Sequence, residues 1–178
     1  MNKGASAPLL LVQQAVDYAS NFSETNPTME YIQGDITNET SGLIIHGVNC
    51  QGRMGSGVAL AIKTKWPQIY DAYMAHEQGR KVLGQVQYVE INDNLHVGNC
   101  WTQEFFGNDG RVYADRAALF RVLLQVFGYC AQRNLVLKTP KIAAGLAGLD
   151  WERDVVPLFE LVQTAYPQVK VQVFVYGP

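Results

Sequence analysis

Short apolar runs and longer helical repeats alternate along the chain from residue 29 onward. The runs have the length and β-branched content of strands, and Gly, Asn or Asp bound most of them. We assign strands to residues 29–33, 42–47, 84–91, 95–102, 135–144 and 171–176, with Pro140 interrupting the fifth. The third and fourth strands are expected to pair as a hairpin through the turn at 92–94.

Helices are predicted between these strands. One covers 57–65, and Pro67 either ends it or begins a second helix that runs to ~Glu77. The longest covers 113–133, because apolar residues recur there at helical spacing. Its expected core stripe is Phe120, Leu123, Leu124, Phe127 and Ala131. The last begins at Trp151, and its apolar face is formed by Val155, Leu158, Phe159 and Val162.

This alternation predicts an α/β fold, specifically a three-layer α/β/α sandwich with a mixed, mostly parallel central sheet. The domain covers residues 29–178. Residues 1–28 are an N-terminal extension, with one helix expected over 8–20 and a polar, proline-containing linker at 23–28. The apolar run near the N-terminus is too short for a signal peptide, because polar residues follow it at once.

Composition narrows the class of protein and its partners. The chain of 178 residues is 48% hydrophobic and 17% charged, which is typical of a globular domain. A net charge of −2 offers no broad basic surface, so we expect no stable nucleic-acid complex. No stretch approaches the ~20 apolar residues of a membrane span, so we expect a soluble protein. We expect it to be a monomer.

The metal-binding and disulfide-forming residues are scattered. The three cysteines (50, 100 and 130) provide neither a disulfide framework nor a CxxC pair, which indicates a reducing cytoplasm. The three histidines (46, 76 and 96) have no ligand spacing between them. The sequence therefore predicts no metal site, and we expect no cofactor.

Two glycine-rich loops, at 47–57 and 145–150, each follow a buried strand and precede a helix. In an α/β sheet this placement brings both loops to the carboxyl edge, where ligands bind. Helix N-termini and left-handed glycines present backbone N–H groups there, which suits a diphosphate. A plain turn is the alternative for each loop, since neither matches a dinucleotide-binding or P-loop motif. The residues alone indicate a phosphate-containing small molecule of undefined kind.

Four stretches together resemble the macrodomain family, whose members bind ADP-ribose. They are YIQGDIT (31–37), IIHGVNCQGRMGSGVALAIKTKWP (44–67), TQEFFGNDGRVYADRAAL (102–119) and TPKIAAGLAGLDWE (139–152). The likeness covers 29–178 and is nearest to the branch that holds ADP-ribose-1″-phosphate phosphatases, ADP-ribose glutamate hydrolases and antitoxins acting on ADP-ribosylated DNA.

The resemblance implies ligand-binding roles for individual residues. Asp35 would accept a hydrogen bond from the adenine amine beside Ile36, and Tyr176 would stack on the ring; the alternatives are a turn residue and an ordinary strand tyrosine. The distal ribose and the phosphates would contact Asn49, Gln51, Met54, Gly55, Ser56, Gly57, Val58, Gly145, Leu146, Ala147 and Gly148. Phe105 or Phe106 would pack on the distal ribose.

Two departures from the family pattern bear on the chemistry. The hydrolase and antitoxin branches carry a lysine where this chain has Gln103, and a carboxamide cannot attack or stabilise an opened ribose. Gln103 is kept only as a ligand contact. The glutamate hydrolases also carry an aspartate where this chain has Ala147. Both differences argue against release of ADP-ribose by that route.

The phosphatase branch fits better, and it suggests His46, Arg53 and Asp150 as catalytic residues. His46 would act as acid or base, Arg53 would pair with phosphate oxygens, and Asp150 would orient water. The alternatives are a hydrogen-bonded strand histidine, a solvated arginine and a helix cap. The function implied is hydrolysis of ADP-ribose-1″-phosphate to ADP-ribose and phosphate. A non-catalytic ADP-ribose reader and an ADP-ribosyl hydrolase remain the alternatives.

Overall fold

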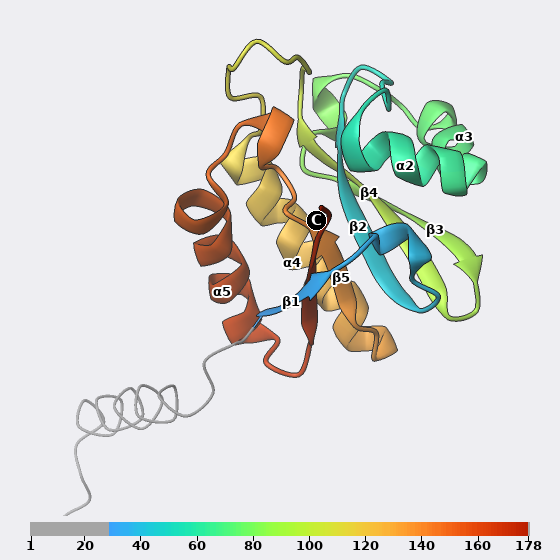
Figure 1. The fold of residues 1–178 in the computed structure, drawn as a ribbon, viewed down its shortest axis with the longest axis vertical. Coiled ribbons are helices and arrows are strands. Elements are labelled where there is room, and N and C mark those ends of the chain that lie inside the picture. The colour runs from blue at the N-terminus through green and yellow to red at the C-terminus, as the bar shows by residue number, and fades with distance from the viewer. Residues whose placement is uncertain (1–28, 178) are drawn as a thin grey trace, which may run out of the picture.

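Six strands pair into one mixed sheet in the computed structural model, which describes residues 29–177 (Figure 1). The strands are β1 (Met29–Gln33), β2 (Gly42–Asn49), β3 (Val86–Asn92), β4 (Leu95–Gln103), β5 (Leu137–Pro140) and β6 (Val171–Val175). Their order across the sheet is β1-β6-β5-β2-β4-β3. Neighbours run parallel except β3 and β4, which form the predicted hairpin. The predicted helix over 8–20 and the linker at 23–28 lie outside the described residues.

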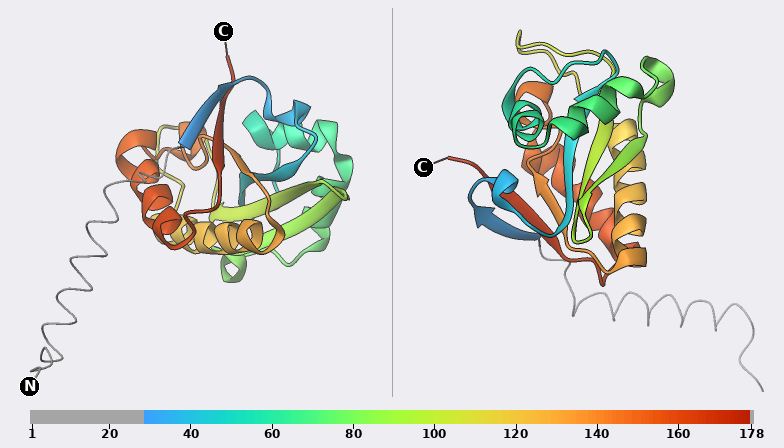
Figure 2. Two further views of the ribbon diagram at one scale, coloured as in Figure 1. Left: turned by 90° about the horizontal axis from the view of Figure 1, so that it is seen from below. Right: turned by 90° about the vertical axis from the view of Figure 1, so that its right-hand side faces the viewer.

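Helices cover both faces of this sheet. The helices are α2 (Gly57–Lys65), α3 (Pro67–Ala75), α4 (Arg116–Arg133) and α5 (Val156–Ala165). Alternate residues of β2 point to opposite faces, so Ile45 packs under α4 and α5 whereas Ile44 packs under α2 and α3. In Figure 2 (left), α4 and α2 lie on opposite sides of the sheet. The predicted three-layer sandwich is confirmed.

The longest helix, α4, is capped at both ends. Asp115 precedes it, and its carboxylate accepts a hydrogen bond of 2.8 Å from the Ala118 N–H. Asn134 ends it in the left-handed conformation at φ 53°. The predicted core stripe is wrong at Leu124, whose side chain is 40% exposed. Leu123 and Phe127 are buried as predicted, and the whole buried face comprises Ala118, Leu119, Val122, Leu123, Val126, Phe127 and Cys130.

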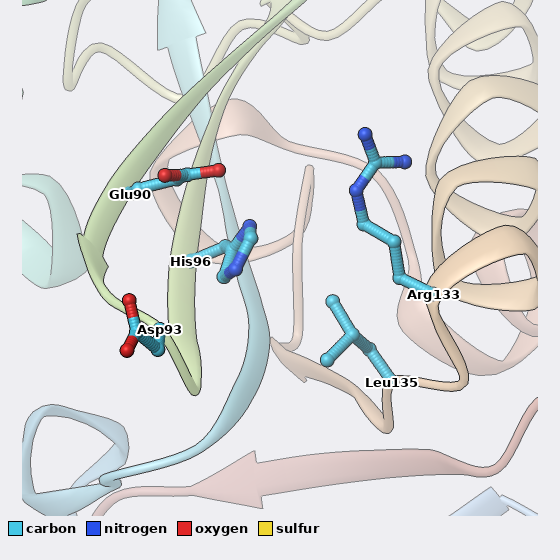
Figure 3. Close-up of a pocket in the computed structure, with 5 residues that line it drawn as sticks. All are labelled: Glu90, Asp93, His96, Arg133 and Leu135. Atoms are coloured by element: carbon cyan, nitrogen blue, oxygen red, sulfur yellow. The ribbon is translucent and has the colours of Figure 1, made fainter.

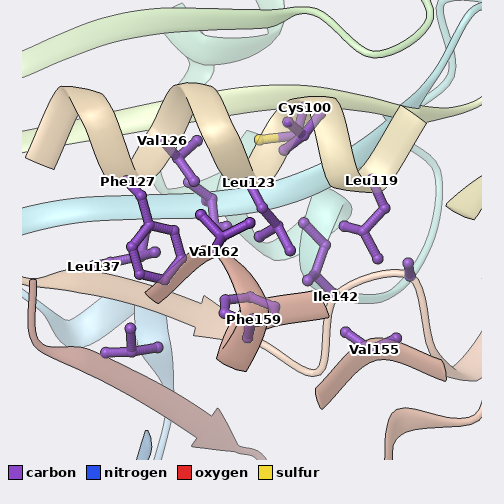
Figure 4. Close-up of a cluster of buried hydrophobic side chains, with 14 of the residues drawn as sticks. Cys100, Leu119, Leu123, Val126, Phe127, Leu137, Ile142, Val155, Phe159 and Val162 are labelled. Carbon is purple, nitrogen blue, oxygen red and sulfur yellow. The ribbon is translucent and has the colours of Figure 1, made fainter. Parts of the chain in front are cut away.

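The core under α4 and α5 is closed by large side chains. Phe127 and Phe159 meet edge to face with ring centroids 6.1 Å apart. Figure 4 shows Leu123 and Val126 of α4 directed toward Val162 of α5. This face of the sheet is therefore filled by side chains of the protein itself.

The strand predicted over 135–144 is shorter in the structure. β5 ends at Pro140, and the chain then turns through Ala143, which has φ 62°. Proline cannot donate to a ladder and left-handed backbone cannot continue a strand. The second glycine loop therefore begins at residue 141, and it includes the short turn η3 (Gly145–Ala147).

Two further observations concern the cysteines and the helices of the described residues. Cys50, Cys100 and Cys130 are all free and buried. Between residues 29 and 177, no helix is long and apolar enough to cross a membrane, and no cluster of three or more His, Cys, Asp or Glu is arranged to hold a metal ion.

Candidate functional site

Both glycine loops lie at one edge of the sheet. Strands β1, β6, β5, β2 and β4 are mutually parallel, so their carboxyl ends meet there. The segments that leave these ends are 34–38, 176–177, 141–150, 50–56 and 104–115. They contain most of the predicted site residues, and the others lie in the adjoining elements: His46 and Asn49 in β2, Gln103 in β4, and Gly57 and Val58 in the first turn of α2.

The first glycine loop is organised by Asn49, the last residue of β2. Its carboxamide oxygen accepts hydrogen bonds from the N–H groups of Gln51 (3.0 Å) and Arg53 (3.3 Å). Its amide nitrogen donates to the Arg53 carbonyl oxygen at 2.8 Å. The residue is only 6% exposed. The Asn49 carboxamide is thus engaged mainly by the loop itself, and its contact with the distal ribose stays a prediction.

Of the remaining residues of the first loop, Met54 is buried and anchors the loop, and residues 55–57 form an exposed ridge. The side chain of Met54 is buried among the residues under α2 and α3 and anchors the loop there, so a ligand contact at this residue would have to come from its backbone. Gly55, Ser56 and Gly57 are exposed. A Cβ on either glycine would meet nothing within 4 Å, and Gly57 has φ 56°. This ridge leads into the first turn of α2, whose N–H groups lack partners within the helix.

Gln51 and Val58 flank this ridge. Gln51 is exposed and is free to reach a ligand through its side chain. Val58 is half-buried and packs against the core under α2.

The second glycine loop is held by backbone contacts. The Ala147 carbonyl oxygen accepts hydrogen bonds from the N–H groups of Tyr113 (2.9 Å) and Ala114 (3.0 Å). Gly148 has φ 90°, and a Cβ there would lie 2.9 Å from the Cα of Val112. Only glycine fits this position, because any side chain would strain the backbone and collide with the neighbouring segment. Gly145, with φ 60°, and Leu146, which is 55% exposed, face outward.

Asp35 and Tyr176 lie at the end of the β1 and β6 pair. The Oδ1 atom of Asp35 accepts hydrogen bonds of 2.8 Å from both the N–H and the hydroxyl group of Thr37. Its other oxygen makes no hydrogen bond within residues 29–177. Asp35 thus serves as a turn residue, which was the alternative to the adenine-binding role. One of its carboxylate oxygens can still accept a hydrogen bond from a ligand. Ile36 is buried, whereas Tyr176 is 81% exposed.

His46 is 1% exposed and lies in the layer between β2 and α3. Its Nε2 is 2.7 Å from the Asn99 carboxamide oxygen. The Asn99 nitrogen donates to Gln87 and to the Ile69 carbonyl, so the Asn99 oxygen must accept and Nε2 must carry the proton. Burial lowers the pKa of His46 to about 4, although the Asn99 hydrogen bond raises it. The catalytic role expected for His46 is therefore not supported, because this ring is neutral and sealed from ligands.

Asp150 and Arg53 are both exposed. Asp150 Oδ1 accepts a hydrogen bond of 2.8 Å from the Arg153 N–H and caps the wide turn η4 (Trp151–Val155). Asp150 therefore acts as a helix cap through one carboxylate oxygen, which was the alternative to its catalytic role. The Arg53 guanidinium makes no ion pair with any described residue.

Asp154, a buried neighbour that sequence reasoning missed, supports this turn. Its carboxylate accepts from the Asp150 N–H at 2.9 Å and pairs with Arg116 and Arg153. Hydrogen bonds, first from Arg153 and then from the Asp150 N–H, lower the pKa of Asp154 to about 2. No motif marks this residue, since a charged residue in a helix is usually solvated.

The segment after β4 closes the edge. Gln103 donates a hydrogen bond of 2.7 Å from Nε2 to the Phe105 carbonyl oxygen, so its carboxamide shapes the turn. Phe105 and Phe106 project from that turn and are 53% and 47% exposed. They present apolar surface beside the two loops.

A separate pocket lies at the opposite edge of the sheet. Figure 3 shows Glu90 and Asp93 on one wall, Arg133 and Leu135 on the other, and His96 between them. It contains none of the residues that the motifs nominate. We therefore assign the candidate site to the carboxyl edge.

No model of a known protein family matches the chain. An ADP-ribose 1″-phosphate phosphatase of Meyerozyma guilliermondii is 35% identical over 154 residues, which cover 70% of this chain and 88% of that protein. A DNA ADP-ribosyl glycohydrolase of Mycobacterium tuberculosis is 27% identical over 127 residues, which cover 68% of this chain. The chain spans 35% of the length of that glycohydrolase.

A solved macrodomain protein from Streptomyces coelicolor superposes with a TM-score of 0.66 at 29% identity, covering 84% of this chain and all of that one. With the phosphatase likeness, which extends over most of both chains, this match identifies the family. The chain belongs to the macrodomains.

Proposed function

We propose that the carboxyl edge binds ADP-ribose and that the protein hydrolyses ADP-ribose-1″-phosphate to ADP-ribose and phosphate. The observation that carries the proposal is the convergence of two glycine loops on one edge beside Asp35. The exposed ridge at 55–57 and residues 145 and 146 of the second loop offer N–H groups to a diphosphate, whereas the N–H groups of Ala147 and Gly148 donate within that loop. The free oxygen of Asp35 suits the adenine amine, and the exposed ring of Tyr176 suits its face.

The phosphatase activity is supported by the most extensive likeness among the relatives named above. In this reaction a water oxygen bonds to phosphorus while the bond from phosphorus to the 1″ oxygen breaks. One proton of the water ends on the 1″ oxygen and the other on the released phosphate. The chain needs a cation for the phosphoryl oxygens and an acceptor that orients the water.

Arg53 and Asp150 are our candidates for these two tasks. Arg53 is exposed on the first loop, and its guanidinium has no carboxylate partner within residues 29–177. Asp150 follows the second loop, and only one of its oxygens is used by the cap. His46 is not included, because its ring is sealed in the core.

A reader that binds ADP-ribose without turnover is the second candidate. It is favoured by the burial of His46, which leaves the edge without the one histidine proposed as an acid or base. Release of ADP-ribose from protein or DNA is the third, since relatives at lower identity are named DNA ADP-ribosyl glycohydrolases.

A turnover panel followed by NMR distinguishes the three. Phosphate release from ADP-ribose-1″-phosphate, with ADP-ribosylated protein and DNA left intact, is the expected result. Arg53→Gln should lower phosphate release at least tenfold, and His46→Gln should leave it within about twofold. Binding of ADP-ribose without any product would establish the reader and overturn the phosphatase.

A further inference from the structure

The hydroxyl group of Tyr73 lies inside the turn made by residues 49–53. It donates a hydrogen bond to the Asn49 carbonyl oxygen and lies 3.2 Å from the Asn49 carboxamide oxygen. The same carboxamide oxygen accepts from the N–H groups of Gln51 and Arg53. Tyr73 therefore contacts the residue that organises the first glycine loop.

The surroundings of the phenol oxygen support this placement. Tyr73 is fully buried on α3, and its ring packs on Trp101 with centroids 5.7 Å apart. Burial raises the pKa of Tyr73 to about 12, while the backbone N–H groups of Arg53 and Gly52 lower it. Those two N–H groups belong to the loop, so the phenol oxygen is near several of its polar atoms.

Backbone contacts hold only the start of the same loop. The Cys50 N–H donates to the carbonyl oxygens of Gln103 (3.1 Å) and Glu104 (3.2 Å), and the Cys50 carbonyl accepts from the Gly79 N–H (2.9 Å). Beyond Cys50, the turn is supported by Asn49, by Tyr73 and by the buried side chain of Met54. Tyr73 is the one of these that comes from a separate helix.

We propose that Tyr73 is a positioning residue that sets the first glycine loop for ligand binding by acting through Asn49. The inference rests on the proposed binding of ADP-ribose at this edge. Without the hydroxyl, Asn49 keeps its contacts with Gln51 and Arg53 but loses its connection to α3. The ridge at 55–57 would then sample other positions, and the diphosphate would lose preorganised N–H groups.

Tyr73→Phe tests this, because it removes one oxygen atom and keeps the packed ring. We expect ADP-ribose to bind the full-length variant about fivefold more weakly, the scale of one lost hydrogen bond. Amide hydrogen exchange at Gln51 and Arg53 should accelerate, whereas exchange in α4 should not change. Calorimetry well below the unfolding temperature of each variant measures the first effect, and NMR measures the second.

Tyr70→Phe is the matched control on the same helix. Tyr70 is half-buried, and its hydroxyl makes no hydrogen bond within the described residues, so this change should alter neither measurement. If Tyr73→Phe does not fold, Asn49→Ala removes the carboxamide that lies 3.2 Å from the phenol oxygen and keeps the backbone carbonyl to which Tyr73 donates. Binding at least fivefold weaker is expected, and binding within twofold of wild type would overturn a role that acts through Asn49.

The outcomes separate this inference from the proposed function. If wild type binds ADP-ribose and Tyr73→Phe binds equally well, the positioning role is overturned while the proposed function stands. If wild type does not bind ADP-ribose, the proposed function fails. Exchange at Gln51 and Arg53 then decides the inference, and unchanged rates in Tyr73→Phe overturn it.

Discussion

The two glycine loops resemble each other in sequence but are stabilised differently. The first depends on side chains, because Asn49 fills its interior and Tyr73 reaches it from α3. The second depends on its backbone, since Ala147 accepts two hydrogen bonds and Gly148 lies against Val112. Glycine therefore has separate uses in the two loops. In the first it leaves a ridge open to ligand, and in the second it permits close contact between segments.

The largest effect is expected at Gly148. Gly148→Ala would place a Cβ 2.9 Å from the Val112 Cα at φ 90°, where an L side chain is already strained. We expect a loss of ~3 kcal/mol in the free energy of unfolding, measured by chemical denaturation. ADP-ribose affinity should fall with it.

Gly55→Ala is the matched control for stability. A Cβ there meets nothing within 4 Å, and Gly55 is not among the glycines with a positive φ. Equal losses of stability in the two variants would contradict the distinction between the loops.

Acid should affect the layer beneath the first loop. The pKa of His46 is lowered by burial to about 4, from an ordinary value of 6.5, so between these values the unfolded chain binds a proton that the folded chain excludes. Stability is then fully present above pH 6.5 and falls as the pH drops toward 4, by up to ~3 kcal/mol from this ring.

His46→Gln should remove that part of the pH dependence and keep a donor for Asn99. Denaturant titrations at pH 7 and 4.5 compare the two proteins. The same loss of stability on acidification in both would show that His46 is not the group responsible.

Asp35 lies outside both loops and allows binding to be changed without disturbing either. Asp35→Ala should weaken ADP-ribose binding about tenfold, or ~1.4 kcal/mol, because the adenine amine loses a charged acceptor. Calorimetry measures this loss. Exchange at the amides of the two loops should remain as in wild type, and unchanged affinity would remove Asp35 from the site.

The smallest effect is expected at Ala143, where a non-glycine residue has φ 62°. Ala143→Gly relieves the strain of left-handed backbone but adds freedom to the unfolded chain, so stability should rise by less than ~1 kcal/mol. A thermal melt detects this shift. A clear loss of stability would mean that the methyl group is needed for packing in the second loop.

Much of the fold was predictable from local patterns, whereas the internal organisation of the site was not. Strand positions, the hairpin and the meeting of both loops at one edge follow from apolar runs and turn residues. The link between Asn49 and Tyr73 joins residues 24 positions apart through a tertiary contact, and no local motif marks it. His46 illustrates the same limit. The sequence around a histidine at the end of a strand is the same whether its ring faces a ligand or the core.

An NMR titration of the full chain with ADP-ribose tests the central assignment most directly. We predict that amide shifts will change at Asp35, at residues 55–58 and at 145–148. Glu90, His96 and Arg133, which line the pocket at the opposite edge, should not respond. Shifts confined to that opposite pocket, or none at saturating ADP-ribose, would contradict the assignment of the site to the carboxyl edge.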